Sequence, residues 1–407
     1  MAKSLYSQHF KNLPPEKNLK KFRIICEKHA GFLRNQIKAS QLSAIDISFA
    51  TGDLKQFEKF AKLISIYKKI LVLGVGGSSL GGKTLTALNP QNKLEFLESI
   101  DPTTVKNCLS KIDFKNTFFL VISKSGETIE TICQTLILLD EIKKSKIKNF
   151  SKQFLFVTES ETNSLAKIAK KIGAEITSHP NKIGGRYSCF SIVGLLPALL
   201  AGLDAKKIRS GAKKMVEDFL QNGDYVINSC AAQICLYELG FANNVIMPYI
   251  DNLKNFTDWY RQLWAESLGK NGFGSIPINS MGTIDQHSQL QLYLDGPKDK
   301  FFTFLTQKNH PQNFLIKDLP SCKTLFGGKK LSEIVRVEQE TTIEVLNRKK
   351  LPIRIFEITK LDEEVLGGLM MQMFLETILI AQVKGINPFD QPAVELRKKL
   401  AKATLKV

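Results

Sequence analysis

The sequence predicts an α/β protein with two α-β-α sandwich domains on parallel sheets, flanked by helical segments at both ends. Short apolar runs end in glycine or serine, and each is followed by a polar turn and then a helical pattern. This alternation spans about residues 45–180 and resumes after residue 203. The length of 407 residues suits two or three domains. We therefore expect a helical arm over 1–40, a first domain over 41–203, a second over 204–385 and a C-terminal helix over 386–407.

Four apolar runs mark the strands of the first domain. They are Ile70–Gly74, Leu94–Leu97, Thr117–Ile122 and Phe154–Val157. After the third run, residues 131–139 carry apolar side chains at helical spacing. Strands that alternate with helices in this way predict a parallel sheet with helices on its faces.

The second domain repeats this logic after an apolar helix near residues 190–202. A helix over 226–240 leads to a strand over 244–249 and to a helix over 253–268. Further expected elements are strands at 301–305 and 352–358 and helices at 361–384 and 391–405. The two domains are therefore expected to be copies of one architecture, although no sequence identity between them is visible.

The basic residues outnumber the acidic ones by 57 to 39, which gives a net charge of +18. Such a surplus suits a nucleic acid or an anionic substrate. The densest basic cluster, residues 143–148, lies at the end of a predicted helix, where cations suit the helix dipole, and it lacks interleaved aromatic residues. A lysine-rich surface explains this pattern, so we expect no nucleic-acid partner.

The cysteines and the apolar stretches restrict the class of protein further. The seven cysteines form no C-x-x-C pair and no zinc spacing with histidines, which favours a reducing compartment and no metal. Residues 189–203 are too short to cross a bilayer and contain Pro197, and residues 365–383 carry Glu376. Both stretches are expected to be buried helices, and no leader pattern opens the sequence, so a cytoplasmic protein without a membrane partner is predicted.

A glycine-rich turn over residues 74–82 follows the first strand. Its glycines allow close approach of the backbone to an anion, and a helix N-terminus follows. A dinucleotide site would look similar, with Glu98 or Asp101 as the acidic residue on the ribose. A tight turn without a ligand is the other interpretation that the motif leaves open.

The segment Ser123-Lys-Ser-Gly-Glu-Thr128 also lies between a strand and a helix. Three hydroxyl groups around a glycine, together with free backbone N–H groups, can bind several oxygens of one phosphate. Helix capping by Ser125 or Thr128 would account for one hydroxyl group but not for three. We therefore predict a phosphate site here.

Two segments carry candidate catalytic groups. Arg186 follows two glycines and is a fixed cation that can stabilise a developing negative charge. Gln262 and Glu266 are four residues apart and share a helix face, and Glu266 lies beside Trp264, where it could act as a base. Read alone, Arg186 could instead be a surface arginine in a glycine turn, and Glu266 a solvated glutamate on an amphipathic helix.

Two later segments complete the set of polar candidates. His287, one of five histidines, ends the segment that begins at Asn279, and a lone histidine is more often structural than catalytic. The last helix opens with Asp390 as the predicted N-cap. Gln391 and Lys398 are expected on one face of that helix, two turns apart, although a lysine-rich terminal helix is usually only solvated.

The phosphate loop resembles the signature of the sugar isomerase (SIS) superfamily, which contains isomerases as well as sensors of sugar phosphates. All these segments together resemble the glucose-6-phosphate isomerase family over about residues 70–400. The shared patterns are a Gly-Gly-Ser turn, Ser-Lys-Ser-x-x-Thr, Gly-Gly-Arg-Tyr-Ser, Glu-Ser-x-Gly-Lys, a downstream histidine and Phe-Asp-Gln-x-Ala-Val-Glu-x-x-Lys. One departure is Pro392-Ala393, where many members have Trp-Gly, and a proline is well suited to a first helical turn.

The resemblance implies two SIS-type domains and an aldose–ketose isomerase that interconverts glucose 6-phosphate and fructose 6-phosphate without a cofactor. It implies that Glu266 moves a proton between C2 and C1 through a cis-enediol, that Arg186 stabilises the enediolate, and that His287 with Lys398 opens the sugar ring. It implies substrate-binding roles for Gly77, Ser78, Ser123, Lys124, Ser125, Thr128, Gln262 and Gln391. It also implies a homodimer with a shared active site, in which the histidine comes from the partner subunit.

Two alternatives remain open on sequence alone. A sugar-phosphate sensor would carry a helix-turn-helix unit before a single sugar domain, and residues 1–40 show no convincing one. A related isomerase could also accept mannose 6-phosphate, whereas an amino-sugar enzyme would need an ammonia source that is not evident.

Overall fold

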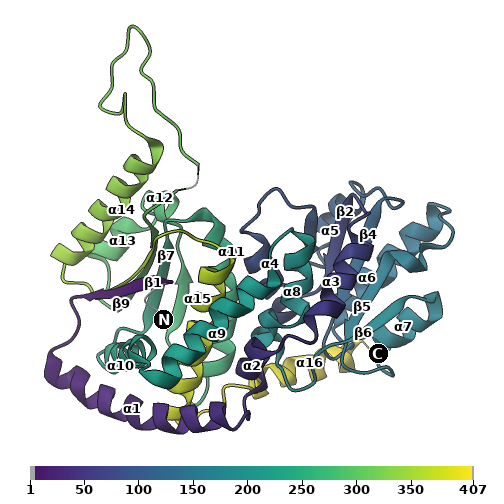
Figure 1. The fold of residues 1–407 in the computed structure, drawn as a ribbon, viewed down its shortest axis with the longest axis horizontal. Coiled ribbons are helices and arrows are strands. Elements are labelled where there is room, and N and C mark those ends of the chain that lie inside the picture. The colour runs from purple at the N-terminus through teal and green to yellow at the C-terminus, as the bar shows by residue number, and fades with distance from the viewer. Residues whose placement is uncertain (1–4, 311, 406–407) are drawn as a thin grey trace.

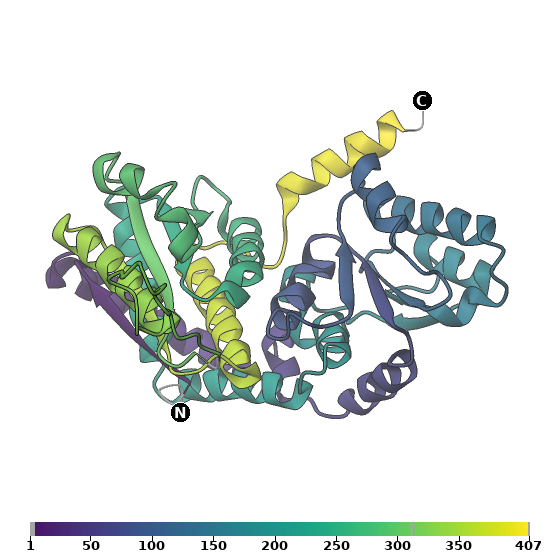
Figure 2. The same ribbon diagram turned by 90° about the horizontal axis from the view of Figure 1, so that it is seen from above.

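The computed structural model describes residues 5–310 and 312–405, so residues 1–4 of the expected arm and residues 406–407 of the expected last helix lie outside it. The chain forms two halves, each built around a five-stranded sheet (Figures 1 and 2). The first sheet, which we call sheet B, has the order β3-β2-β4-β5-β6 and is parallel throughout. Its strands are β2 (Lys69–Leu73), β3 (Leu94–Leu97), β4 (Thr117–Ile122), β5 (Phe154–Thr158) and β6 (Glu175–Ser178).

Both faces of sheet B are covered by helices, because its central strands are apolar on both sides. Leu71 and Leu73 pack against the layer of α5, α6 and α7, whereas Ile70 and Val72 point to the layer of α3, α4 and α8. The helices of this half are α2 (Ser43–Asp46), α3 (Leu54–Ile64), α4 (Leu80–Thr86), α5 (Pro102–Leu109), α6 (Ile129–Lys144), α7 (Ser164–Ile172) and α8 (Ile192–Leu200). This confirms the predicted α-β-α sandwich.

The second sheet, sheet A, has the order β1-β10-β9-β7-β8. Its parallel strands are β7 (Asn243–Pro248), β8 (Ile276–Asn279), β9 (Lys300–Gln307) and β10 (Ile353–Ile358). Among the parallel strands of each sheet, taken in chain order, the first lies between the second and the third, and the fourth lies beyond the third. The prediction that the halves repeat one architecture is therefore confirmed in the strand order.

The prediction of a purely helical N-terminal arm is wrong for residues 6–11. Strand β1 (Tyr6–Lys11) joins the edge of sheet A antiparallel to β10, so this sheet is mixed rather than parallel. The Tyr6 side chain is buried, and its hydroxyl group donates to Gln372 at 2.7 Å. This short segment pairs only with β10, a strand more than 340 residues later in the chain, so local sequence could not reveal the strand.

Helix α1 (Glu16–Lys38) fulfils the helical part of the expected arm and packs against α10 and α15 of the second half. Helices α13 and α14 cover one face of sheet A, and α10, α11 and α15 lie on the other. The remaining helices are α9 (Ala205–Gln221), α10 (Asp224–Glu238), α11 (Lys254–Leu268), α12 (Gly282–Asp285), α13 (Leu290–Asp295), α14 (Leu331–Arg348), α15 (Glu363–Val383) and α16 (Pro392–Thr404). Short 3-10 turns are η2 (Ile47–Phe49), η3 (Gly76–Ser78), η4 (Phe150–Gln153), η5 (Gly185–Phe190) and η6 (Asp251–Leu253).

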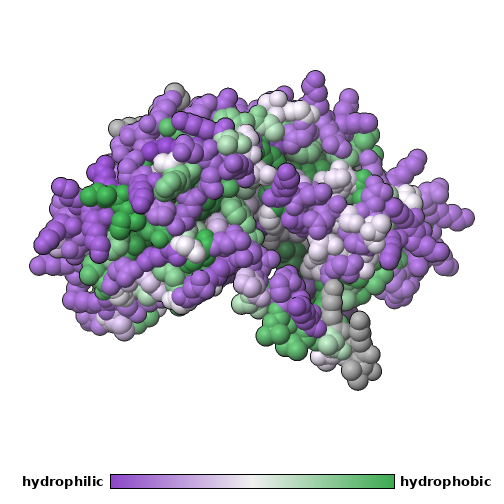
Figure 3. All heavy atoms as spheres, turned by 90° about the horizontal axis from the view of Figure 1, so that it is seen from below, coloured by the Kyte–Doolittle hydropathy of each residue, from purple (hydrophilic) through white to green (hydrophobic). Residues whose placement is uncertain are grey.

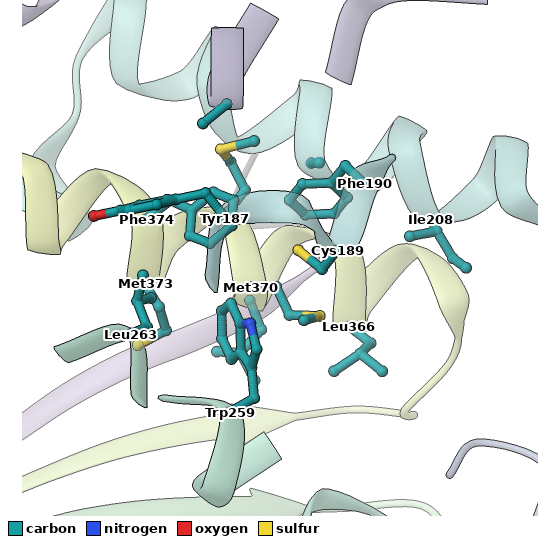
Figure 4. Close-up of a cluster of buried hydrophobic side chains, with 14 of the residues drawn as sticks. Tyr187, Cys189, Phe190, Ile208, Trp259, Leu263, Leu366, Met370, Met373 and Phe374 are labelled. Atoms are coloured by element: carbon teal, nitrogen blue, oxygen red, sulfur yellow. The ribbon is translucent and has the colours of Figure 1, made fainter. Parts of the chain in front are cut away.

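Helix α15 is the central helix of the core. By length and composition it could cross a membrane, but 94% of its most apolar 18-residue window is buried inside the protein. This confirms the prediction of a buried helix. Its Phe374 side chain contacts the rings of Tyr187, Phe190 and Trp259 (Figure 4), so residues from both halves pack on one helix.

Candidate active site

The glycine turn after β2 lies directly against the turn that carries Arg186. A Cβ atom on Gly77 would stand 2.2 Å from the carbonyl carbon of Gly185 and 2.5 Å from the Arg186 nitrogen, so only glycine fits. Gly76 has a φ of +58°, and a Cβ atom there would lie 2.8 Å from Nε2 of Gln262. The turn therefore brings Gly77 and Ser78 of the first half beside α11 of the second half.

Arg186 is the centre of the site. Its guanidinium group is buried and donates five hydrogen bonds. The acceptors are Ser267 Oγ (2.8 Å), Glu266 Oε2 (3.2 Å), Gln391 Oε1 (2.8 Å) and the carbonyl oxygens of Pro388 (2.6 Å) and Asp390 (2.9 Å). The fork thus joins three segments that are far apart in sequence.

The backbone on either side of Arg186 is held by the core, which fixes the position of the cation. Tyr187 and Phe190 pack on Phe374, as Figure 4 shows. The Tyr187 hydroxyl group lies 3.0 Å from Ser267 Oγ, the acceptor of Arg186 Nε. Burial raises the pKa of Tyr187 to about 12, so this phenol stays neutral and acts as a fixed hydrogen-bonding partner.

Glu266 and Gln262 share one face of α11, as their spacing predicted. Gln262 Nε2 donates to Glu266 Oε1 at 3.1 Å, and Arg186 holds the other carboxylate oxygen. The Glu266 side chain is 32% exposed to solvent, whereas the Arg186 side chain is 3% exposed. A ligand can therefore reach the carboxylate, while the cation behind it stays out of water.

Lys270 was not assigned a role from the sequence, and the structure places it at this site. Its Nζ contacts the carbonyl oxygen of Asn387 (2.5 Å), the carbonyl oxygen of Asp390 (2.7 Å) and Oδ1 of Asp390 (2.8 Å). The hydrogen bond from Lys270 lowers the pKa of Asp390. The expectation that Asp390 caps the last helix is wrong, because Gln391 is the N-cap residue and the Asp390 carboxylate pairs with Lys270.

Lys270 and Arg186 together fix residues 387–391, and so they set the place of Gln391 and the start of α16. Two carbonyl oxygens bind each cation, and the carbonyl of Asp390 binds both. The Glu-Ser-x-Gly-Lys pattern contains Lys270, but its partners lie 117 and 120 residues away. Only a contact prediction could have found them.

The predicted phosphate loop is ordered by its own side chains. Ser123 Oγ lies 2.9 Å from Thr128 Oγ1 and accepts the backbone N–H of Gly126 at 3.1 Å. Ser125 is exposed, and Lys124 lies 3.8 Å from Glu159. Helix α6 starts after Thr128 without a side-chain cap, so its first N–H groups face the loop.

The segment after β5 supports the phosphate loop from the side. Gly126 has a φ of +65°, and a Cβ atom there would collide with Asn163 at 2.1 Å. Asn163 donates to Thr158 and caps α7, whereas Glu127 accepts from the backbone and hydroxyl groups of Ser164. This close approach explains why residue 126, between Ser125 and Thr128, is a glycine.

Lys398 and His287 are not brought to Glu266 within this chain. Lys398 is exposed on α16 and pairs with Glu395 at 2.7 Å. His287 is exposed in the turn after α12, and in residues 5–310 and 312–405 no hydrogen bond or ion pair reaches its ring. Arg397 of α16 lies 3.9 Å from Glu130 in the first turn of α6, so the last helix reaches the phosphate-loop helix (Figure 2).

The acidic residues that a dinucleotide site would need are occupied. Glu98 accepts from Ser79 Oγ (2.5 Å) and pairs with Lys83 (2.6 Å), and Asp101 caps α5. Among the described residues, no group of three or more His, Cys, Asp and Glu side chains could hold a metal ion. The arrangement instead combines a partly exposed carboxylate, a buried cation beside it and a loop of hydroxyl groups at the start of a helix, and such groups suit proton transfer on a phosphorylated substrate.

Comparisons with known proteins identify the family of this chain. The family described as phosphoglucose isomerase matches residues 48–407. The glucose-6-phosphate isomerase of Methanocaldococcus jannaschii is 34% identical over 347 residues, which cover 83% of this chain and 84% of that protein. A hypothetical protein from Thermus thermophilus has a similar structure, with a TM-score of 0.87, 25% identity and coverage of 98% of this chain and 100% of its own.

A glucose-6-phosphate isomerase from Chlamydia trachomatis shares the fold with a TM-score of 0.81 at 19% identity, covering 97% of this chain and 86% of that one. The family match extends over most of the chain, from before the first sheet to the last helix. The chain belongs to the phosphoglucose isomerase family.

Proposed function

We propose that this protein interconverts glucose 6-phosphate and fructose 6-phosphate, and that Glu266 transfers the proton between C2 and C1. The contact of the Glu266 carboxylate with the buried Arg186 guanidinium carries this proposal. A reachable base beside a fixed cation is what removal of a proton next to a carbonyl group requires. Family membership supports the choice of reaction and of substrate.

The phosphate group of the substrate is proposed to bind the loop Ser123–Thr128. Lys124, Ser125 and Thr128 offer a cation and hydroxyl groups, and Ser123 keeps the loop in shape. The uncapped start of α6 adds backbone N–H donors for the dianion. Gly77 and Ser78 would then line the sugar. Their turn follows β2 of sheet B, the sheet that also leads to the phosphate loop, and it contacts α11, which carries Glu266.

The proton transfer leaves a negative charge on the sugar oxygens at C1 and C2 in the cis-enediolate. Arg186 stabilises this charge from a site with 3% exposure, where an ionic interaction is little screened. Gln262 and Gln391 contact Glu266 and Arg186 and would position the sugar hydroxyls. Gln262 Oε1 is buried and has no hydrogen-bond partner in the described part of the chain, so the protein itself leaves this acceptor unsatisfied.

Opening of the sugar ring is proposed to use His287 and Lys398 in a homodimer with a shared active site. The exposed place of His287 supports a role toward a second subunit. Apolar side chains are exposed on α16, including Leu396 and Leu400, and Figure 3 shows a hydrophobic patch where this helix projects. The long loop between β9 and α14 also exposes apolar residues, namely Phe314, Leu315, Leu319, Leu325 and Phe326. Such surfaces favour association.

Glu266→Gln tests the central step. The variant should bind substrate normally and lose isomerisation by several orders of magnitude, because an amide cannot accept the proton. Asp53→Asn is a matched control, since Asp53 pairs with the buried Arg209 and both acidic side chains are 32% exposed. A coupled assay that separates glucose 6-phosphate from mannose 6-phosphate measures turnover and tests the mannose activity. Turnover of Glu266→Gln near that of the control would exclude Glu266 as the base.

A mixing experiment tests the shared site. Glu266→Gln and His287→Ala, each inactive alone, are co-expressed with different tags, and the hybrid dimer is purified. If the histidine crosses the interface, one of the two sites in each hybrid has both wild-type residues, and about half of wild-type activity returns. No recovery in purified hybrids, or a fully active monomer, would contradict the shared site.

A further inference from the structure

Glu98 takes no part in the proposed reaction, yet it holds the start of helix α4 through two charged contacts. It directly follows β3 at the carboxyl edge of sheet B, the edge that also carries the glycine turn after β2 and the phosphate loop after β4. One carboxylate oxygen accepts from Ser79 Oγ at 2.5 Å, and the other lies 2.6 Å from Nζ of Lys83. The carboxylate thus joins two residues that are one helical turn apart.

The glycine turn has few other anchors, because Gly76 and Gly77 have no side chains. From outside the turn and helix α4, the described residues supply only two side-chain hydrogen bonds to residues 76–79. One is the contact of Glu98 with Ser79. The other comes from Ser188 Oγ, which lies 3.3 Å from the carbonyl oxygen of Gly77 but 2.7 Å from that of Gly185. Because a hydroxyl group has a single proton to donate, Glu98 is the firmer of the two anchors.

The turn must be placed accurately, because it touches residues of the candidate active site. A Cβ atom on Gly77 would stand 2.2 Å from the carbonyl carbon of Gly185, and a Cβ atom on Gly76 would stand 2.8 Å from Nε2 of Gln262. The turn therefore cannot move toward these residues without displacing them. Its position is coupled to that of Gln262 and to that of the segment that carries Arg186.

The two neighbouring serines of this turn differ in how their hydroxyl groups are used. Ser79 is 1% exposed, and its hydroxyl group lies 2.5 Å from the Glu98 carboxylate and 3.1 Å from the carbonyl oxygen of Gly76. The charged acceptor at the shorter distance receives the proton. The Ser78 hydroxyl group, by contrast, has no hydrogen bond to any of residues 5–310 and 312–405, and it is only half-buried. Glu98 therefore directs Ser79 into the protein, while Ser78 stays available to a ligand.

We propose that Glu98 is a positioning residue for the sugar part of the substrate, and that it acts through Ser79 by fixing the turn of Gly77 and Ser78. It does not contact the phosphate loop, so the phosphate part of the substrate should be held independently. That this turn lines a sugar rests on the proposed function.

The affinity of the full-length protein for two ligands tests this role. Glucitol 6-phosphate, a sugar phosphate without a carbonyl group, should contact both the turn and the phosphate loop, whereas inorganic phosphate should contact the loop alone. Glu98→Ala should weaken binding of glucitol 6-phosphate about tenfold, which corresponds to the loss of one hydrogen bond to a charged group. It should leave the Kd for inorganic phosphate within about twofold of wild type. The kcat should stay within about threefold, because Glu98 contacts neither Arg186 nor Glu266.

Glu95→Ala is the matched control. Glu95 lies on β3 and pairs with Lys69, and these side chains are 39% and 29% exposed, compared with 28% and 25% for Glu98 and Lys83. Because Glu95 makes no contact with the glycine turn, its removal should leave the affinities for both ligands unchanged.

Two further variants show whether Glu98 acts through Ser79. Glu98→Gln keeps an acceptor for the Ser79 hydroxyl group and should restore most of the affinity for glucitol 6-phosphate. Ser79→Ala should weaken this affinity to the same extent as Glu98→Ala, and the double variant should show no further loss.

Unchanged affinity of Glu98→Ala for glucitol 6-phosphate, an equal loss of affinity for inorganic phosphate, or additive losses in the double variant would each overturn the proposal. A wild-type protein that binds glucitol 6-phosphate but fails to isomerise would instead contradict the proposed function. The two affinities would still decide the role of Glu98, because neither measurement requires turnover.

Discussion

Replacement of Arg186 by lysine separates the charge of this side chain from its geometry. Lysine keeps the positive charge, but its ammonium group has three N–H donors at one nitrogen atom. Arg186 donates five hydrogen bonds from three nitrogen atoms, so at least two are lost in the variant. The acceptors that then share the three remaining donors include Glu266 and the carbonyl oxygens of Pro388 and Asp390, which fix residues 387–391.

Two magnitudes follow from this loss. Hydrogen bonds to a charged group contribute about 1.5–3 kcal/mol each, so the free energy of unfolding should fall by about 3–6 kcal/mol. A donor that stabilises a developing oxyanion typically contributes a factor of about 10²–10³ in kcat. We therefore expect Arg186→Lys to lower kcat by about that factor at a temperature where the variant is still folded.

Arg209→Lys is the matched control for this experiment. The Arg209 side chain is as buried as that of Arg186, at 3% exposure, and it also donates five hydrogen bonds, including two to Asp53 at 2.6 Å. Its bonds join α9 to the first half, away from Glu266. The control should lose stability to a similar extent while kcat stays within about twofold of wild type.

Thermal denaturation and steady-state kinetics on the three proteins give the result. If Arg186→Lys retained wild-type kcat while folded, the proposed role of Arg186 in stabilising the enediolate would be wrong. Equal losses of kcat in both variants would show that the effect comes from the fold rather than from the site.

Two further predictions concern contacts that the sequence did not reveal. Lys270→Met should release residues 387–391, lower kcat about tenfold and raise amide hydrogen exchange over residues 387–405, because three contacts to Asn387 and Asp390 disappear; unchanged exchange there would contradict this positioning role. His179 is buried, and burial lowers its pKa to about 4 from its ordinary value near 6.5. As the pH falls, His179 therefore takes up a proton in the unfolded protein at a higher pH than in the folded protein. The free energy of unfolding should fall between pH 6.5 and 4 by about 3 kcal/mol in total. In His179→Gln, urea denaturation across this range should show a correspondingly smaller fall, and an identical pH dependence would refute the assignment.

The sequence determined the local part of the fold. The strands of sheet B other than β6 and most of the helices could be predicted, because apolar runs, glycine turns and helical spacing are local patterns. The short strands β6 and β8 and the edge strand β1 were missed, since their pairing depends on strands formed elsewhere in the chain. Helices α3, α9 and α14 were missed as well, although their amphipathic patterns were present in the sequence.

The candidate site divides in the same way. The loop that is proposed to bind phosphate could be recognised in the sequence, because its hydroxyl groups, its glycine and the helix after it are neighbours in sequence. That Arg186 contacts Glu266, 80 residues later, and Gln391, 205 residues later, was decided only by the tertiary structure. Packing of both halves on α15 brings these segments together, and the burial that results gives the guanidinium its fixed position. A sequence alone lists the residue types, but the distances and burial that make them a site arise only when distant segments pack against one core.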